Sequence, residues 1–121
     1  MNLRIHEDSN VIRIDVLGAL DAEAALNAQH AVKDVITSAA STVTIDFSEV
    51  EFIDPSGIGM IVFLFKRLSA AGRRLHIVGV QGQPERLIRK LGLDGPLYVS
   101  FKTRPLSGGA GVVLGQETRA S

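Results

Sequence analysis

The stretch "VEFIDPSGIGMIVFLF", residues 50–65, passes from a strand-like segment through Asp-Pro-Ser-Gly into a long apolar segment. Asp is a preferred N-cap and Pro is favoured at the first helical position, so Asp54 and Pro55 predict the start of a helix. Ser56 then falls at the second helical position, where its hydroxyl is not needed as a cap and is free for modification. A second interpretation stays open, in which Ser56 is itself the cap and Gly57 begins the helix.

The helix expected over residues 56–71, ended by Gly72, has two unlike faces. At about 100° per residue, one face carries the apolar residues that should meet the core. These are Ile58, Ile61, Val62, Leu64, Phe65 and Leu68. The opposite face carries Ser56, Met60, Phe63 and Arg67. An exposed stripe with Met and Phe among polar residues is typical of a partner-binding surface, although a single exposed Phe needs no such explanation.

Strand and helix patterns alternate on both sides of this segment. Runs of alternating β-branched residues predict strands, and apolar residues at helical spacing predict helices. The expected strands are residues 3–6, 11–18, 42–47, 74–80 and 97–101; the expected helices are residues 22–38, residues 56–71 and a short helix that begins at Pro84 and stops at Gly92. The order β-β-α-β-α-β-α-β predicts an α/β fold with a mixed, mostly parallel sheet and helices packed against it.

The length of 121 residues suits one domain, which we place at residues 1–101. From residue 102 to residue 121 the periodicity is lost and the chain becomes rich in Gly and Ser, so we expect a flexible tail. The first residues do not resemble a signal peptide, and the longest apolar run is far short of a membrane span, so no direct membrane insertion is expected. The absence of Cys suits a reducing compartment, and we expect the cytoplasm.

Composition and motif spacing argue against several function classes. Thirteen basic residues balance thirteen acidic ones, so charge indicates no nucleic-acid partner. His6, His30 and His76 fall in different expected elements and show no metal-ligand spacing. Ser56 lacks the flanking glycines of a hydrolase nucleophile, because Asp54 and Ile58 occupy those positions. We therefore expect neither an enzyme nor a bound cofactor or metal.

Three carboxylates form the remaining candidate group. Asp21 follows the second expected strand, Asp46 lies near the end of the third, and Asp54 precedes Ser56. Strand ends and helix starts gather at one edge of a parallel sheet, where sites of α/β folds form, so a nucleotide-binding or enzymatic protein is an alternative hypothesis. For Asp21 and Asp54 taken singly, helix capping is the favoured interpretation.

The segments "VTIDFSEVEFIDPSGIGMIV" and "RLHIVGVQGQPERLIRKLGLD", in this element order, resemble the STAS domain, the fold shared by anti-sigma factor antagonists and the cytoplasmic part of sulfate transporters. The resemblance covers residues 3–101 and implies a single STAS-like domain. In the antagonists, the motif at the start of the second helix carries a Ser or Thr that accepts phosphate from a partner anti-sigma kinase. Ser56 occupies that position, and Asp54 and Gly57 match their motif positions. Asp21 resembles the acid that supports phosphorylation and partner contact.

The resemblance implies a cytoplasmic binding module that sequesters an anti-sigma factor serine kinase and is switched by phosphorylation of Ser56. A phosphatase is the second implied partner, and a weak homodimer is left open. Met60, Phe63 and Arg67 would contact the partner. Pro55 departs from the family pattern, which often has Ser there, and proline stiffens the loop and removes an amide donor. The alternative is an unphosphorylated STAS subunit of a regulatory scaffold or of a membrane lipid-transport complex.

Overall fold

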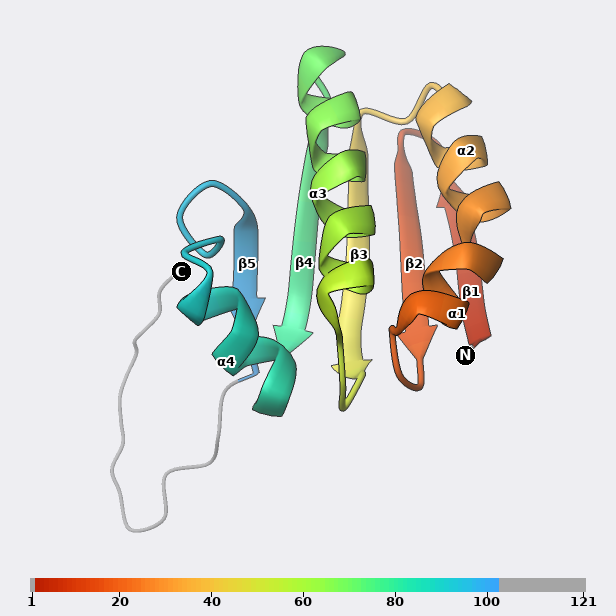
Figure 1. Ribbon diagram of the computed structural model, residues 1–121. Coiled ribbons are helices and arrows are strands. Elements are labelled where there is room, and N and C mark those ends of the chain that lie inside the picture. The colour runs from red at the N-terminus through yellow and green to blue at the C-terminus, as the bar shows by residue number, and fades with distance from the viewer. Residues whose placement is uncertain (1, 103–121) are drawn as a thin grey trace, which may run out of the picture.

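The computed structural model describes residues 2–102 and forms one α/β domain with a five-stranded sheet (Figure 1). The strands are β1 (Asn2–Asp8), β2 (Val11–Leu17), β3 (Thr42–Glu49), β4 (Arg74–Val80) and β5 (Tyr98–Phe101). The helices are α1 (Ala22–Asn27), α2 (Gln29–Thr37), α3 (Pro55–Ala70) and α4 (Gly82–Lys90). The predicted fold class is confirmed, with one more helix than the sequence indicated.

The strands lie in the order β1-β2-β3-β4-β5. The hairpin partners β1 and β2 are antiparallel, and every other neighbouring pair is parallel, as predicted. The tight turn between β1 and β2 places Ser9 at a positive φ of 50°. The register aligns one row of β-branched residues across all five strands, formed by Ile5, Ile14, Ile45, Ile77 and Val99. Such residues favour the pleated, half-buried environment of a sheet.

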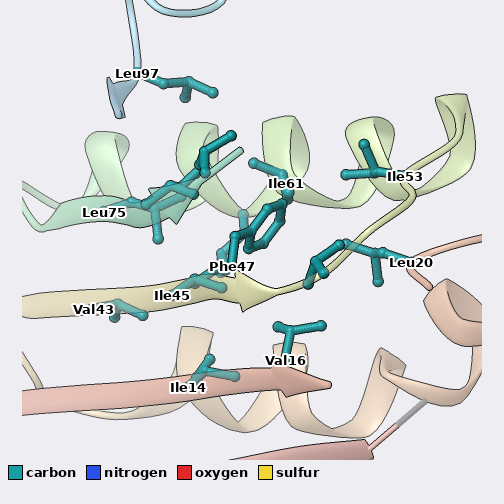
Figure 2. Close-up of a cluster of buried hydrophobic side chains, with 14 of the residues drawn as sticks. Ile14, Val16, Leu20, Val43, Ile45, Phe47, Ile53, Ile61, Leu75 and Leu97 are labelled. Atoms are coloured by element: carbon teal, nitrogen blue, oxygen red, sulfur yellow. The ribbon is translucent and has the colours of Figure 1, made fainter. Parts of the chain in front are cut away.

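The core lies between the sheet and the helices, which cover one face of the sheet (Figure 1). Alternation along β2 and β3 sends every second side chain into this layer. Figure 2 shows the ring of Phe47 between β3 and α3, close to Ile61. Phe47 is fully buried, and burying a side chain of this kind stabilises the fold by about 2–3 kcal/mol.

The opposite face of the sheet is open and polar. Arg13 of β2 donates hydrogen bonds to Asp15, at 3.1 Å, and to Asp46 of β3. The amide of Ser48 donates to Asp46 at 2.8 Å. Partial burial acts to raise the pKa of Asp46, but the Ser48 hydrogen bonds and the Arg13 guanidinium outweigh it, so the pKa of this carboxyl is lowered.

The structure corrects two helix predictions. The single helix predicted over residues 22–38 is two helices, because the ψ of Ala28 is −1°, far from the helical value, and interrupts the helix there. The helical spacing of apolar residues continues across this break, so periodicity gave no sign of it. The last helix begins at Gly82 rather than Pro84.

The sequence also predicted where the domain ends. The flexible tail predicted over residues 102–121 lies almost wholly outside the described residues and stays a prediction. Within residues 2–102, none of the helices is both long and apolar enough to cross a membrane.

Candidate functional site

The start of α3 presents Ser56 to solvent. Asp54 is the N-cap, and its carboxylate accepts a hydrogen bond from the amide of Gly57 at 3.1 Å. Pro55 occupies the first helical position, where its fixed φ suits the helix and its missing N–H loses nothing. Ser56 is exposed, and its hydroxyl is not the cap. Of the two interpretations that the sequence left open, the structure shows the one with Asp54 as cap.

Asp21 and Asp54 lie next to each other although 33 positions separate them in the sequence. The segment before α1 and the segment before α3 form a parallel bridge between Leu20 and Ile53. In it the amide of Leu20 donates to Phe52 O at 2.9 Å, and the amide of Asp54 donates to Leu20 O at 3.2 Å. Asp21 caps α1 by accepting from Ala24 N at 2.9 Å. The N-termini of α1 and α3 therefore open at the same end of the domain.

Gly57 makes this close approach sterically feasible. A Cβ at this position would lie 2.4 Å from Leu20 O and 2.8 Å from a side-chain carbon of Ile53. Both distances are far below van der Waals contact, so any side chain would push the start of α3 away from Leu20. The glycine that matches the family motif therefore has a structural role in keeping the capping residues Asp21 and Asp54 together.

Gln83 holds the opposite side of the same loop. Its amide group donates to Ile53 O at 2.9 Å and accepts from Ile53 N at 2.8 Å, so it pairs with the backbone as a neighbouring strand would. Gln81 also donates from its side chain to Ser48 O at 3.0 Å. The loop that carries Ser56 is thus fixed between Leu20 and Gln83. Nothing in the sequence indicated that Gln83 fixes this loop, because a Gln near the start of a helix is usually exposed to solvent.

A groove of about 690 Å³ runs between α3 and the α1–α2 pair. The four residues of the predicted stripe, Ser56, Met60, Phe63 and Arg67, all line its α3 wall. The facing wall, which sequence reasoning did not identify, includes Leu26, Gln29, Val32, Lys33 and Ile36. Leu26 and Phe63 keep 63% and 49% of their surface exposed, so apolar surface on both walls is accessible. This groove has the apolar lining and the few polar groups of a binding surface.

The structure does not bring Asp46 to this site. Its side chain is bound to Arg13 and Ser48 on the open face of the sheet, whereas Asp21 and Asp54 cap helices on the covered face. The edge formed by the three carboxylates, which the enzymatic hypothesis required, is therefore absent. His6, His30 and His76 form no metal-binding group with other residues in the part of the chain that the structure describes.

Comparison with known proteins agrees with this geometry. The family model described as "STAS domain" matches residues 2–104. The chain belongs to the STAS domain family. It is 30% identical over 97 residues to the anti-sigma-B factor antagonist of Listeria monocytogenes, covering 78% of this chain and 85% of that protein. This match confirms the predicted resemblance to the anti-sigma factor antagonists.

Solved structures of this family share the fold. An anti-sigma factor antagonist from Mycobacterium paratuberculosis superposes with a TM-score of 0.74 at 21% identity, covering 82% of this chain and 84% of that one. The Bacillus cell fate determinant SpoIIAA, solved in its phosphorylated form, gives a TM-score of 0.68 at 21% identity, covering 84% and 92%. At these identities the two structures establish the fold of the STAS domain protein and not the roles of its residues.

Proposed function

We propose that this STAS domain protein is an anti-sigma factor antagonist, a binding module without catalytic activity of its own that sequesters an anti-sigma factor kinase. The similarity to the anti-sigma-B factor antagonists over most of both chains supports this function. The observation that carries it is the exposed Ser56 at the start of α3, on the wall of an apolar groove. An accessible hydroxyl beside an adaptable apolar surface suits a phosphorylation-switched docking site.

Phosphate on Ser56 would change the charge of the docking surface and leave the fold intact. It would add a charge of about −1.5 to −2. The amide of Gly57 is already bound by Asp54, and Pro55 has no amide, so the first turn of α3 offers few free donors to a phosphate. Asp21 and Asp54 would repel it. The phosphate therefore stays hydrated and exposed, which favours its removal by a phosphatase and disfavours burial against the kinase.

Pro55 favours a second candidate function. Proline at the first helical position fixes the backbone next to Ser56 and limits how the loop can enter a kinase active site. In the second candidate, the domain is an unphosphorylated STAS subunit of a regulatory scaffold or of a membrane lipid-transport complex. Ser56 would then remain a neutral part of the docking wall.

One capture experiment separates the two functions. The full chain is used as bait in native lysate, and the captured proteins are identified by mass spectrometry. We expect an ATPase-like anti-sigma factor kinase, and adding Mg²⁺ and ATP to the captured complex should place phosphate on Ser56 in peptide mapping. Capture of transporter or scaffold subunits, with Ser56 unmodified after ATP addition, would refute the proposal in favour of the second candidate.

A further inference from the structure

The half of the groove away from Ser56 carries two cations, Lys33 on α2 and Arg67 on α3. The residues that line the groove include no carboxylate. Within residues 2–102, neither cation lies at ion-pair distance from an Asp or Glu, whereas Arg13 and Arg89 are both paired. Arg67 lies 5.7 Å from the centre of the Phe63 ring. This end of the groove therefore has positive charge that no described residue neutralises.

Between these cations and Ser56 the groove lining is mostly apolar, with Gln29 as its polar side chain. Leu26 and Val32 line one wall of the groove, and Met60 and Phe63 line the other. The groove volume of about 690 Å³ falls within the range of sites that bind small molecules. Asp21 and Asp54 cap α1 and α3 beyond the Ser56 end, so the groove has an apolar middle and a basic end, and carboxylates lie just outside its other end.

From this arrangement we infer that the groove binds a small anionic amphiphile, a single apolar chain that ends in a carboxylate. The carboxylate would lie between Lys33 and Arg67, where charge-assisted hydrogen bonds are available. The chain would lie against Leu26, Met60 and Phe63, where burial of its methylene groups would favour binding. Asp21 and Asp54, beyond the Ser56 end, would repel the headgroup and so favour this orientation.

This inference goes beyond the proposed function, since it requires no anti-sigma factor. It also predicts a regulatory link, because the chain of the amphiphile would cover Met60 and Phe63, which the partner is proposed to contact. Bound amphiphile and docked partner would then exclude each other. An acidic, apolar segment of a protein partner is the other occupant that the same chemistry could accept, and the experiment separates the two.

The test is calorimetric titration of decanoate, as the probe, into the full chain. We expect saturable binding with one site per chain, and methyl NMR shifts confined to residues such as Leu26 and Met60. The double variant Lys33→Gln with Arg67→Gln should bind at least about tenfold more weakly, a loss of about 1.4 kcal/mol. The matched variant Lys66→Gln with Arg86→Gln, which removes one Lys and one Arg outside the groove lining, should bind as wild type. Thermal melts verify that both variants are folded.

Three results would overturn the amphiphile site. The first is no saturable heat at millimolar decanoate. The second is equal binding of decyltrimethylammonium, whose headgroup has the opposite charge. The third is unchanged affinity in the groove variant. If decanoate fails while the groove variant loses capture of its partner from lysate, the occupant is a protein segment instead. The titration contains no anti-sigma factor, so absence of decanoate binding would not contradict the proposed function. Likewise, failure to capture an anti-sigma factor kinase would not contradict the amphiphile site.

Discussion

Gly57 lies where the start of α3 comes closest to the segment that follows β2. The carbonyl oxygen of Leu20 occupies the space that a Cβ at residue 57 would need. Because a Cβ is fixed to the backbone, it cannot rotate away from this contact. Gly59, one half-turn further along the same helix, has nothing within 4 Å of a Cβ placed there. A side chain at residue 57 would therefore clash, whereas a side chain at residue 59 would have free space.

Replacing each glycine with alanine should give opposite effects on stability. Gly57→Ala should lower the free energy of unfolding by about 2 kcal/mol through overpacking against Leu20 and Ile53. Gly59→Ala should raise it by up to about 1 kcal/mol, because alanine is the better helix former. Urea denaturation of both variants measures the difference. Equal stability of the two variants would show that α3 can shift without cost and that Gly57 is not needed for its position.

At the residue scale, the helical wheel predicted the exposure of Ser56, and local helix-start preferences offered Asp54 as one of two possible caps. The sequence could not predict why residue 57 is glycine. That requirement comes from Leu20, which is distant in the chain and meets Gly57 only after β2 and β3 have paired in register. The two-point contact of Gln83 with Ile53 depends on the same tertiary arrangement.

At the scale of elements, α3 has a buried face and a groove face. Ile61, Leu64 and Leu68 are nearly fully buried, whereas half of the Phe63 surface is exposed in the groove. The helical spacing in the sequence predicted this division for these residues, but Met60, which was predicted on the exposed stripe with Phe63, is partly buried and packs against the core. The spacing did not predict the facing wall, because the pairing of α1 and α2 with α3 is a property of the folded sheet.

Phe63→Asp should leave the domain folded and weaken capture of the partner. The exposed half of the ring already contacts water, so a carboxylate there need not be buried. The control is Phe47→Asp, in which a fully buried ring is replaced by a charge at a loss of several kcal/mol. Circular dichroism melts compare the two variants. A large fall in the melting temperature of Phe63→Asp would contradict the assignment of this residue to the groove.

Arg73 connects the ends of α2 and α3. It follows Gly72, whose φ of 72° ends α3, and its guanidinium donates to Val35 O at 2.8 Å and Ile36 O at 2.9 Å. It therefore satisfies the terminal carbonyl of Ile36 and adds a further donor to Val35 O, which also accepts from Ser38. By holding the two helix ends together, Arg73 sets the spacing of the groove walls at the end where Lys33 and Arg67 lie.

Arg73→Met should lower the free energy of unfolding by about 2 kcal/mol, because it removes several charged hydrogen bonds and leaves carbonyl groups unsatisfied. The neighbouring Arg74 is exposed and makes no side-chain hydrogen bond among residues 2–102, so Arg74→Met should change stability by less than about 0.5 kcal/mol. Chemical denaturation of the two variants provides the comparison. An equally small effect at both positions would show that Arg73 does not hold α2.

For the molecule as a whole, the two faces of the sheet have different roles. The covered face builds the core and positions the groove, and the open face carries the Arg13–Asp46 pair. Alternation along the strands separates the residues of the two faces. The sequence placed Asp46 at the same edge as Asp21 and Asp54, because all three lie near strand ends or helix starts. It did not predict that the ion pair with Arg13 would hold the Asp46 side chain on the open face, away from the site.

The pH dependence of stability should reveal the contribution of Asp46. Its pKa is lower in the folded state, so its stabilising effect is present above the pKa of the unfolded chain and is lost as the pH falls through the folded value. Asp46→Asn should therefore cost on the order of 1 kcal/mol at pH 7, with the difference from wild type shrinking below about pH 4. Urea denaturation at a series of pH values measures it. A difference that stays constant to pH 2 would exclude this linkage.

In the proposed switch, the charge state of Ser56 controls docking of an anti-sigma factor kinase on a fold that itself does not change. The most direct measurement is titration of the captured partner with wild type, Ser56→Ala, Ser56→Asp and protein phosphorylated at Ser56, with a thermal melt of each. We predict that wild type and Ser56→Ala bind alike, that the two charged forms bind at least about tenfold more weakly, and that all four melt near the same temperature. Equal affinity of the phosphorylated and unphosphorylated proteins would contradict the switch.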